Sequence, residues 1–332
     1  MLSRIALFLA LSTSVALASS EENIHRDLDA KSGGNLIVDV AFGTIDVASW
    51  AGDKVSIDAH RKIATSDEAK EKQYLAEVPI VITNENNTVT VRARRTEKDS
   101  WSWNCNGNTS MDARYTVRIP KSFNLDLKTG GGMIAANDIS GTAKLSTGGG
   151  KLRLAQLRGP LDAKTSGGSI RLTDCQGALN VSTSGGEIKV ETGSGSLDAR
   201  TSGGSIVVRN FGGDTSVKTS GGQLTLENVG GKLSGKTSGG SITASLVSPL
   251  PGDVDLASSA GSISLSVPSD VAMNVDASAS VGAVSTDLPF VVTRAEREQL
   301  RGALNGGGKS VTLRSSAGSI SIRSAAAKTA MQ

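Results

Sequence analysis

The residues best placed to do chemistry in this chain of 332 residues are its repeated Thr-Ser-Gly-Gly segments. TSGGSI occurs at 165–170, 201–206 and 237–242, with TSGGEI at 183–188 and TSGGQL at 219–224. Glycine-rich turns can cradle a phosphate or, with carboxylates, a calcium ion, and aligned threonines that face water can bind ice. However, only one of the five positions after the glycine pairs is a carboxylate, and no GxxxxGK(S/T) motif precedes a helix. Calcium and phosphate sites are therefore not expected.

The spacing of these segments indicates architecture. Their threonines recur every 18 residues through seven copies, at positions 129, 147, 165, 183, 201, 219 and 237. A fixed short period is the signature of a repeat protein, and the alternation of apolar and polar residues from Leu161 to Leu172 is typical of half-buried strands. We predict an all-β fold, a single-chain β-solenoid (β-helix) with 18-residue rungs, in which corner glycines supply positive φ. The alternation turns the threonines inward, so a buried hydroxyl ladder is expected and ice binding is not.

The chain divides into four predicted parts. Residues 1–18 read as a signal peptide, with Arg4, a short apolar run and the small-residue site Ala16-Leu17-Ala18. Residues 19–120 form an N-terminal β-strand region with capping rungs and an inserted loop at 96–112. Residues 121–246 hold the regular repeats, and 247–332 hold irregular C-terminal rungs and a cap with a short helix at about Arg294–Leu304. We expect an exported chain without a transmembrane segment after signal removal, in the periplasm, at the outer membrane or outside the cell.

Charge and cysteine content narrow the function classes. The net charge is only +3, so no broad basic field points to nucleic acid. Cys105 and Cys175 would meet an oxidising compartment, and whether they form a disulfide is left open. Two cysteines and two histidines, His25 and His60, far apart in the sequence, do not suggest a zinc site.

Two sets of residues could contact a ligand or partner. An outward column just before the corner threonines is mostly basic and could bind an anionic glycan, although nearby aspartates such as Asp162 and Asp198 partly neutralise it; its candidate contacts are Lys164, Arg200, Lys218 and Lys236. Solvated surface pairs are the simpler explanation of this column. Trp101 and Trp103 in the inserted loop could stack on sugars or dock a partner, or they could cover the coil.

The sequence offers little support for catalysis. Glycan-cleaving β-helices need paired carboxylates in a cleft. No outward acidic cluster recurs on adjacent rungs, and the regular repeats contain no histidine. We therefore predict no catalytic residues, no metal site and no cofactor.

The chain resembles the bacterial putative-adhesin family of β-strand repeat proteins, a domain of unknown function. The resemblance rests on the strand–Gly–strand pattern at Leu36–Ile57, the TSGGSI corners and the closing LRSSAGSISIRS, and it extends from about Leu28 to Arg323. It implies a β-solenoid in exported or membrane-associated proteins and supplies no catalytic residues. The loop at 96–112 departs from the family pattern.

The function expected from these observations is that of an exported, non-enzymatic putative adhesin, or of a cell-envelope scaffold or binding module. Its partner would be an envelope glycan or another envelope protein. Two alternatives stay open: a β-helical enzyme acting on envelope or extracellular glycans, and a self-assembling structural protein similar to bactofilins.

Overall fold

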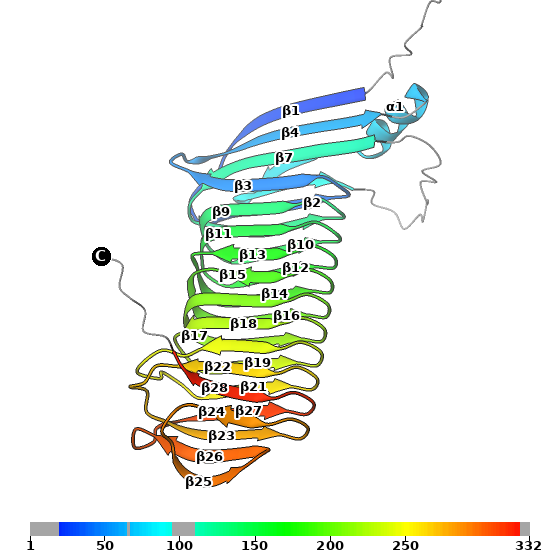
Figure 1. The fold of residues 1–332 in the computed structure, drawn as a ribbon. Helices are drawn as coiled ribbons and strands as arrows, with labels where there is room; N and C mark the ends of the chain where they lie inside the picture. The colour runs from blue at the N-terminus through cyan, green and yellow to red at the C-terminus, as the bar shows by residue number, and fades with distance from the viewer. Residues whose placement is uncertain (1–19, 65–66, 95–109, 326–332) are drawn as a thin grey trace, which may run out of the picture.

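The computed structural model describes residues 20–64, 67–94 and 110–325. Within these residues the chain forms 28 β-strands and one helix, α1 (Glu68–Glu77), which confirms the predicted all-β class. The strands stack into an elongated column with β1 near one end and β25 at the other (Figure 1). Two long faces run along this column, and we name them after β8 and β9.

The β8 face is a continuous ladder that begins at β5 and ends at β25. In spatial order it contains β5 (Val81–Glu85), β6 (Thr88–Ala93), β2 (Gly34–Val40), β8 (Phe123–Thr129), β10 (Ala143–Thr147), β12 (Leu161–Thr165), parts of β14 (Cys175–Thr183), β16 (Gly193–Thr201) and β17 (Ile206–Thr219), then β19 (Leu233–Thr237), β21 (Val254–Ser258), β27 (Lys309–Ser315), β23 (Met273–Ala279), β26 (Gln299–Leu304) and β25 (Val291–Glu296).

The β9 face is a second ladder, which begins at β1 and ends at β24. In spatial order it contains β1 (Ser20–Asp29), β4 (Lys54–Ala64), β7 (Ser110–Pro120), β3 (Thr44–Trp50), β9 (Ile134–Ser140), β11 (Leu152–Arg158), β13 (Ile170–Thr173), β15 (Ile188–Val190), the first part of β17, β18 (Leu224–Val229), β20 (Ile242–Ser245), β22 (Ile263–Val267), β28 (Ile320–Ser324) and β24 (Val284–Thr286).

The pairing register follows the sequence period. Leu161 lies opposite Leu179, and Leu179 opposite Leu197, so neighbouring parallel strands are 18 residues apart. The insertion around residues 246–253 lengthens one step to 21 residues, which places Thr237 opposite Ser258. Because strands in register lie about 4.8 Å apart, equivalent side chains of successive repeats form straight columns.

At both ends the spatial order departs from the chain order. The strand β2 lies between β6 and β8, although β3, β4, α1 and β5 separate it from β6 in the sequence. At the other end, β27 inserts between β21 and β23, so that residues 268–308 lie outermost there. The last repeat in the sequence is therefore not the last in space.

The predicted helix at Arg294–Leu304 is wrong. These residues belong to β25 and β26, an antiparallel pair whose second strand also pairs with β23. Leu300 and Leu304 are buried against the end of the core, so strand pairing and burial override the helix propensity of the charged segment.

The sequence interpretation also missed α1. Asp67 caps this helix by accepting hydrogen bonds from the backbone N–H groups of Ala69 (3.0 Å) and Lys70 (3.4 Å). Glu68 and Lys72 form an i,i+4 ion pair of 2.7 Å. A capping aspartate and an i,i+4 Glu–Lys pair are both sequence signals of a helix N-terminus, so the sequence contained the information needed to predict α1.

The core lies between the two faces and consists of the inward leucine, isoleucine and valine columns. The threonine ladder is buried, as predicted, and the threonines bond to the corner backbone. The Thr183 hydroxyl donates to the Gly168 carbonyl of the preceding repeat at 2.9 Å and accepts from the Gly186 N–H at 3.3 Å. Ser258 and Ser315 make the same two bonds in the later repeats. Each hydroxyl thus links two successive corners.

The role predicted for the corner glycines is wrong for the Thr-Ser-Gly-Gly corner. The second glycine of each pair, such as Gly186, does not adopt positive φ, but a Cβ there would overlap the carbonyl group of the preceding repeat. Positive φ occurs instead at the opposite corner, at Asp174 (51°) and Gly177 (132°). The repeated shape of the first corner therefore comes from close backbone stacking.

Candidate functional site

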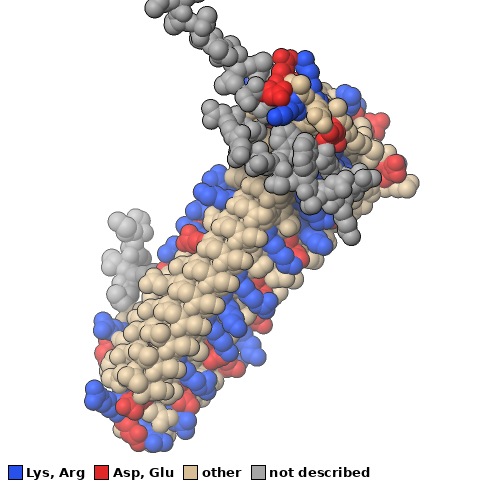
Figure 2. Space-filling view, turned by 90° about the vertical axis from the view of Figure 1, so that its right-hand side faces the viewer, with Lys and Arg blue, Asp and Glu red and all other residues tan. Residues whose placement is uncertain are grey.

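The structure brings the four predicted basic contacts into one column on the β8 face. The pairing register aligns Lys164 with Ser182, Arg200, Lys218 and Lys236 in successive strands. All four basic side chains are exposed. Figure 2 shows Lys and Arg side chains in a row beside a band of the surface that carries no charged residues.

Most of this positive charge is compensated. Lys164 pairs with Asp162 at 3.0 Å, Arg200 with Asp198 at 2.5 Å, and Lys236 with Asp255 at 3.1 Å. Lys218 has no ion pair among the described residues. The column that supplies Asp162, Asp198 and Asp255 to the other three basic residues carries Ser216 and Ser234 next to Lys218. Lys218 is thus the residue of the basic column with the most uncompensated charge.

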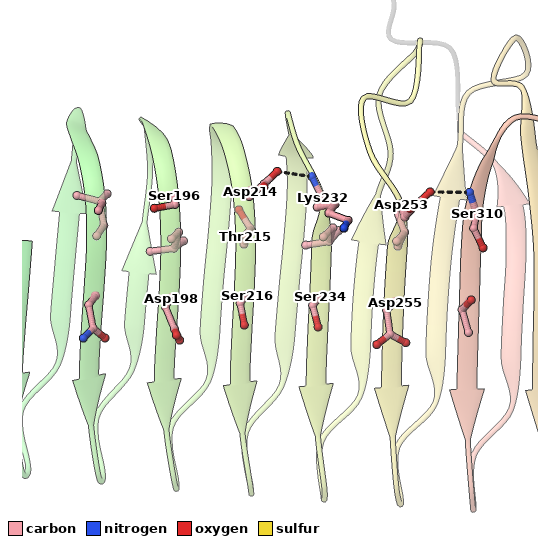
Figure 3. A pocket seen from close by; sticks show the side chains of 17 residues that line it. Ser196, Asp198, Asp214, Thr215, Ser216, Lys232, Ser234, Asp253, Asp255 and Ser310 are labelled. Carbon is pink, nitrogen blue, oxygen red and sulfur yellow. Dashed lines mark hydrogen bonds between the residues drawn. The ribbon is translucent and has the colours of Figure 1, made fainter. Parts of the chain in front are cut away.

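A groove lies where the column of Asp198 and Asp255 carries Ser216 and Ser234 instead of aspartates, and it was not predicted from the sequence. The groove encloses about 750 Å³ on the β8 face between β14 and β27. Its outward lining forms two rows (Figure 3), one with Ser196, Asp214, Lys232, Asp253 and Ser310, the other with Asp198, Ser216, Ser234 and Asp255. Ser216 and Ser234 are shorter than Asp198 and Asp255, which lie on either side of them in this row, and this difference in length explains the hollow.

Backbone bonds hold two of the groove's carboxylates in place. The N–H of Lys232 donates to Asp214 at 2.9 Å, and the N–H of Ser310 donates to Asp253 at 3.0 Å (Figure 3). In the other row Asp255 lies between Lys236 (3.1 Å) and Arg314 (3.6 Å). These contacts fix the acceptors and leave the serine hydroxyls at the centre of the groove.

The groove is chemically suited to binding. It offers hydroxyl, amide and carboxylate groups in register. Of its four aspartates, Asp198 and Asp255 are paired with cations at the margin of the groove, whereas Asp214 and Asp253 have no ion pair among the described residues. No group of three or more His, Cys, Asp or Glu side chains in residues 20–64, 67–94 and 110–325 is placed to hold a metal ion. Aligning the repeats by their 18-residue period and comparing the sizes of outward residues could have located the groove.

The other predicted contacts are not placed. Trp101, Trp103 and Cys105 lie outside the described residues, as does most of the inserted loop, whose last three residues begin β7. Cys175 is fully buried in the core, and burial raises the pKa of its thiol. Its Sγ lies 3.7 Å from the carbonyl oxygens of Leu154 and Thr173. The disulfide stays a prediction.

Both histidines lie on the outer surface of the β1–β4 pair, far from the groove in the strand order. His25 Nδ1 is 2.6 Å from Asp58 Oδ1, and the hydrogen bond and charge of Asp58 raise the pKa of His25 above 6.5. His60 Nδ1 lies 2.7 Å from the Asn23 amide oxygen.

We expect NMR titration to place the pKa of His25 above 6.5, and Asp58→Asn to lower it. Because the folded pKa is raised, the stabilisation from this pair is complete below the unfolded pKa and is lost as pH rises through the folded value. Asp53→Asn, in the turn before β4, is the control and should leave the titration unchanged. An equal His25 pKa in the wild type and the Asp58 variant would contradict the assignment.

Comparison with known proteins places the chain in a family. The model of the Toastrack DUF4097 family matches residues 35–323. The chain belongs to this family. The resemblance found in the sequence, to a domain of unknown function among putative adhesins, is thereby confirmed.

Solved structures that match along most of this chain share little sequence with it. A putative adhesin from Bacteroides fragilis is 12% identical, with 92% of this chain and 98% of that chain covered and a TM-score of 0.30. A putative lipid binding protein from Parabacteroides distasonis is 13% identical, with 92% and 97% covered and a TM-score of 0.39. A putative adhesin from the same species is 9% identical, with 92% and 97% covered and a TM-score of 0.39. No curated protein matches.

Proposed function

We propose that this protein is an exported, non-enzymatic β-solenoid that binds hydroxyl-rich glycans of a cell envelope in the groove on the β8 face, as an adhesin or envelope-binding module. The observation that carries the proposal is the groove with the hydroxyl groups of Ser216 and Ser234 at its centre, between Asp198 and Asp255. The 18-residue pairing register supports the solenoid rungs. No helix within the described residues is long and apolar enough to cross a membrane.

The composition of the groove favours a neutral polyhydroxylated ligand over an anionic one. Fixed acceptors at Asp214 and Asp253 and free hydroxyls at the centre can exchange hydrogen bonds with sugar hydroxyls. Asp214 and Asp253, which accept from backbone N–H groups and have no ion pair among the described residues, would repel an anionic polymer lying in the groove itself. An anionic glycan would instead have to bind along the adjacent basic column, where Lys218 is uncompensated.

The test is a co-sedimentation assay of the chain from Ser19 onward with envelope fractions and purified neutral and anionic glycans. A variant with Ser216→Phe and Ser234→Phe fills the groove, and it should lose about tenfold or more in affinity for the neutral glycan, or ~1.4 kcal/mol. Ser146→Phe, on β10 of the same face but outside the groove, is the matched control and should bind normally. Binding that survives filling of the groove would refute this site.

Two further variants separate the alternative contact residues. If anionic glycan binds along the basic column, Lys218→Gln should weaken binding more than Lys164→Gln, because Lys164 already has Asp162 as a partner. That loss should also shrink as salt rises. The variant Trp101→Ala/Trp103→Ala tests the inserted loop. No binding by the wild type to any fraction would exclude the adhesin proposal.

One observation favours the glycan-cleaving alternative. Asp253, just before β21, and Asp255, on β21, lie two residues apart in one extended segment, so their carboxylates are separated by about 7 Å, a spacing suited to an inverting glycosidase. Against this, Asp253 already accepts a backbone N–H and Asp255 is engaged by two cations. Release of reducing sugar that disappears in both Asp253→Asn and Asp255→Asn would establish the enzyme.

A further inference from the structure

The β8 face ends in two strands that each have a free edge. Within the described residues β5 pairs only with β6, and β25 pairs only with β26. Each outermost strand therefore presents one row of backbone N–H and C=O groups that no strand in residues 20–64, 67–94 and 110–325 pairs with. Such an edge is a template for pairing with another strand.

The directions of these two strands are complementary. From β6 to β23 all strands of the β8 face run parallel. The strand β5 is antiparallel to β6, whereas two antiparallel steps return β25 to the common direction. If two copies stack in the same orientation, β25 of one copy meets β5 of the next as an antiparallel pair. The two strands have similar lengths, six and five residues.

Exposed apolar side chains gather at the same two ends. Val81 on β5 is 47% exposed, while Val291 and Val292 on β25 are 73% and 46% exposed. The other large exposed hydrophobic residues described are Trp50, at the end of β3, and Val281, in the corner before β24. None lies along the regular repeats, so association through apolar contacts would join ends and not sides.

We propose that this protein self-associates head to tail, with β25 of one copy extending the β8 face of a second copy at β5. The contact joins unlike surfaces of copies that stack along one axis, so further copies can add along that axis. A bulge between Val292 and Arg294 and the charges of Arg294 and Glu296 interrupt the edge. These features, and the short seam, make the association weak and concentration-dependent.

Small-angle X-ray scattering and sedimentation velocity of the chain from Ser19 onward would measure this association over a concentration series. The expected result is an increase in maximum dimension and sedimentation coefficient with an unchanged cross-sectional radius. A monomer at every concentration would overturn the proposal. So would a doubled cross-section, which would indicate side-by-side contact.

The polarity of the contact is tested with one blocked end at a time. Val81→Lys should block β5 and Val291→Lys should block β25, so each variant alone should stay monomeric. An equimolar mixture should form dimers and nothing longer, because each variant retains the edge that the other lacks. Val281→Lys places the same charge on an exposed valine outside the edge strands and should associate as the wild type does.

Three results would overturn the head-to-tail contact: association of either edge variant alone, no dimers in the mixture, or loss of association in Val281→Lys. The three valines are exposed, so unchanged circular dichroism and melting temperature should show that every variant is folded. The groove is not involved. The glycan-binding assay and this experiment can therefore fail independently.

Discussion

Gly186→Ala is expected to disrupt the stack around it, whereas Gly185→Ala, one residue away, should leave stability within ~1 kcal/mol of the wild type. A Cβ at Gly186 would overlap the backbone carbonyl of Gly168 in the preceding repeat. That obstacle is backbone held by the strand ladder, so it cannot rotate away as a side chain could. At Gly185 the nearest atom to a Cβ is the Gly167 oxygen at 3.7 Å, an ordinary contact. The loss at Gly186 should be at least ~4 kcal/mol.

Urea unfolding followed by circular dichroism, together with hydrogen exchange of the strand amides, would measure this difference. Hydrogen exchange matters because repeat stacks can open locally, which a single unfolding midpoint would hide. We expect the Gly186 variant to lose protection in β15 and its neighbours first. Equal stability of the two alanine variants would show that close stacking does not explain the second corner glycine.

Thr237→Val is expected to cost ~1–3 kcal/mol, because it leaves two buried backbone groups without their partner. The Thr237 hydroxyl donates to the Gly222 carbonyl at 2.9 Å and accepts from the Gly240 N–H at 3.2 Å. Valine has nearly the same shape but can make neither bond. Thr237→Ser keeps the hydroxyl and should cost less, since Ser258 makes both bonds in the next repeat.

Thermal unfolding of the two variants beside the wild type would check this prediction. The informative quantity is the difference in stability between the valine and serine variants. Valine keeps the buried methyl group and loses the hydroxyl, whereas serine keeps the hydroxyl and loses the methyl group. If valine is tolerated as well as serine, the ladder contributes packing alone, and the hydroxyl bonds are not a source of stability.

The amino-acid sequence alone was enough to establish the repeat and its interior. The 18-residue spacing of the threonines predicted the pairing register, and the alternation around Leu161–Leu172 predicted the inward columns, because a strand has a side-chain period of two and repeats stack in register. The same alternation predicted that the threonines are buried, and the structure confirms this. The spacing also placed Lys164, Arg200, Lys218 and Lys236 in one outward column, which the strand pairing confirms.

Local patterns were less decisive where two conformations compete. The segment from Arg294 to Leu304 has the composition of a helix, yet it forms strands because β23 offers it an unpaired edge and the core end takes up Leu300 and Leu304. The corner glycines were assigned to positive φ, yet those of the Thr-Ser-Gly-Gly corners serve close stacking. Both outcomes depend on neighbours distant in the sequence.

The order of the repeats at the ends and the shape of the surface follow from tertiary contacts and not from any local pattern. Every repeat exposes the same hydrogen-bonding edges, so nothing local selects β27 over β23 as the neighbour of β21. The groove likewise arises where Ser216 and Ser234 from separate repeats meet between longer aspartates. A period fixes which positions align in a column, but the hollows and free edges of the surface depend on how those columns are assembled in space.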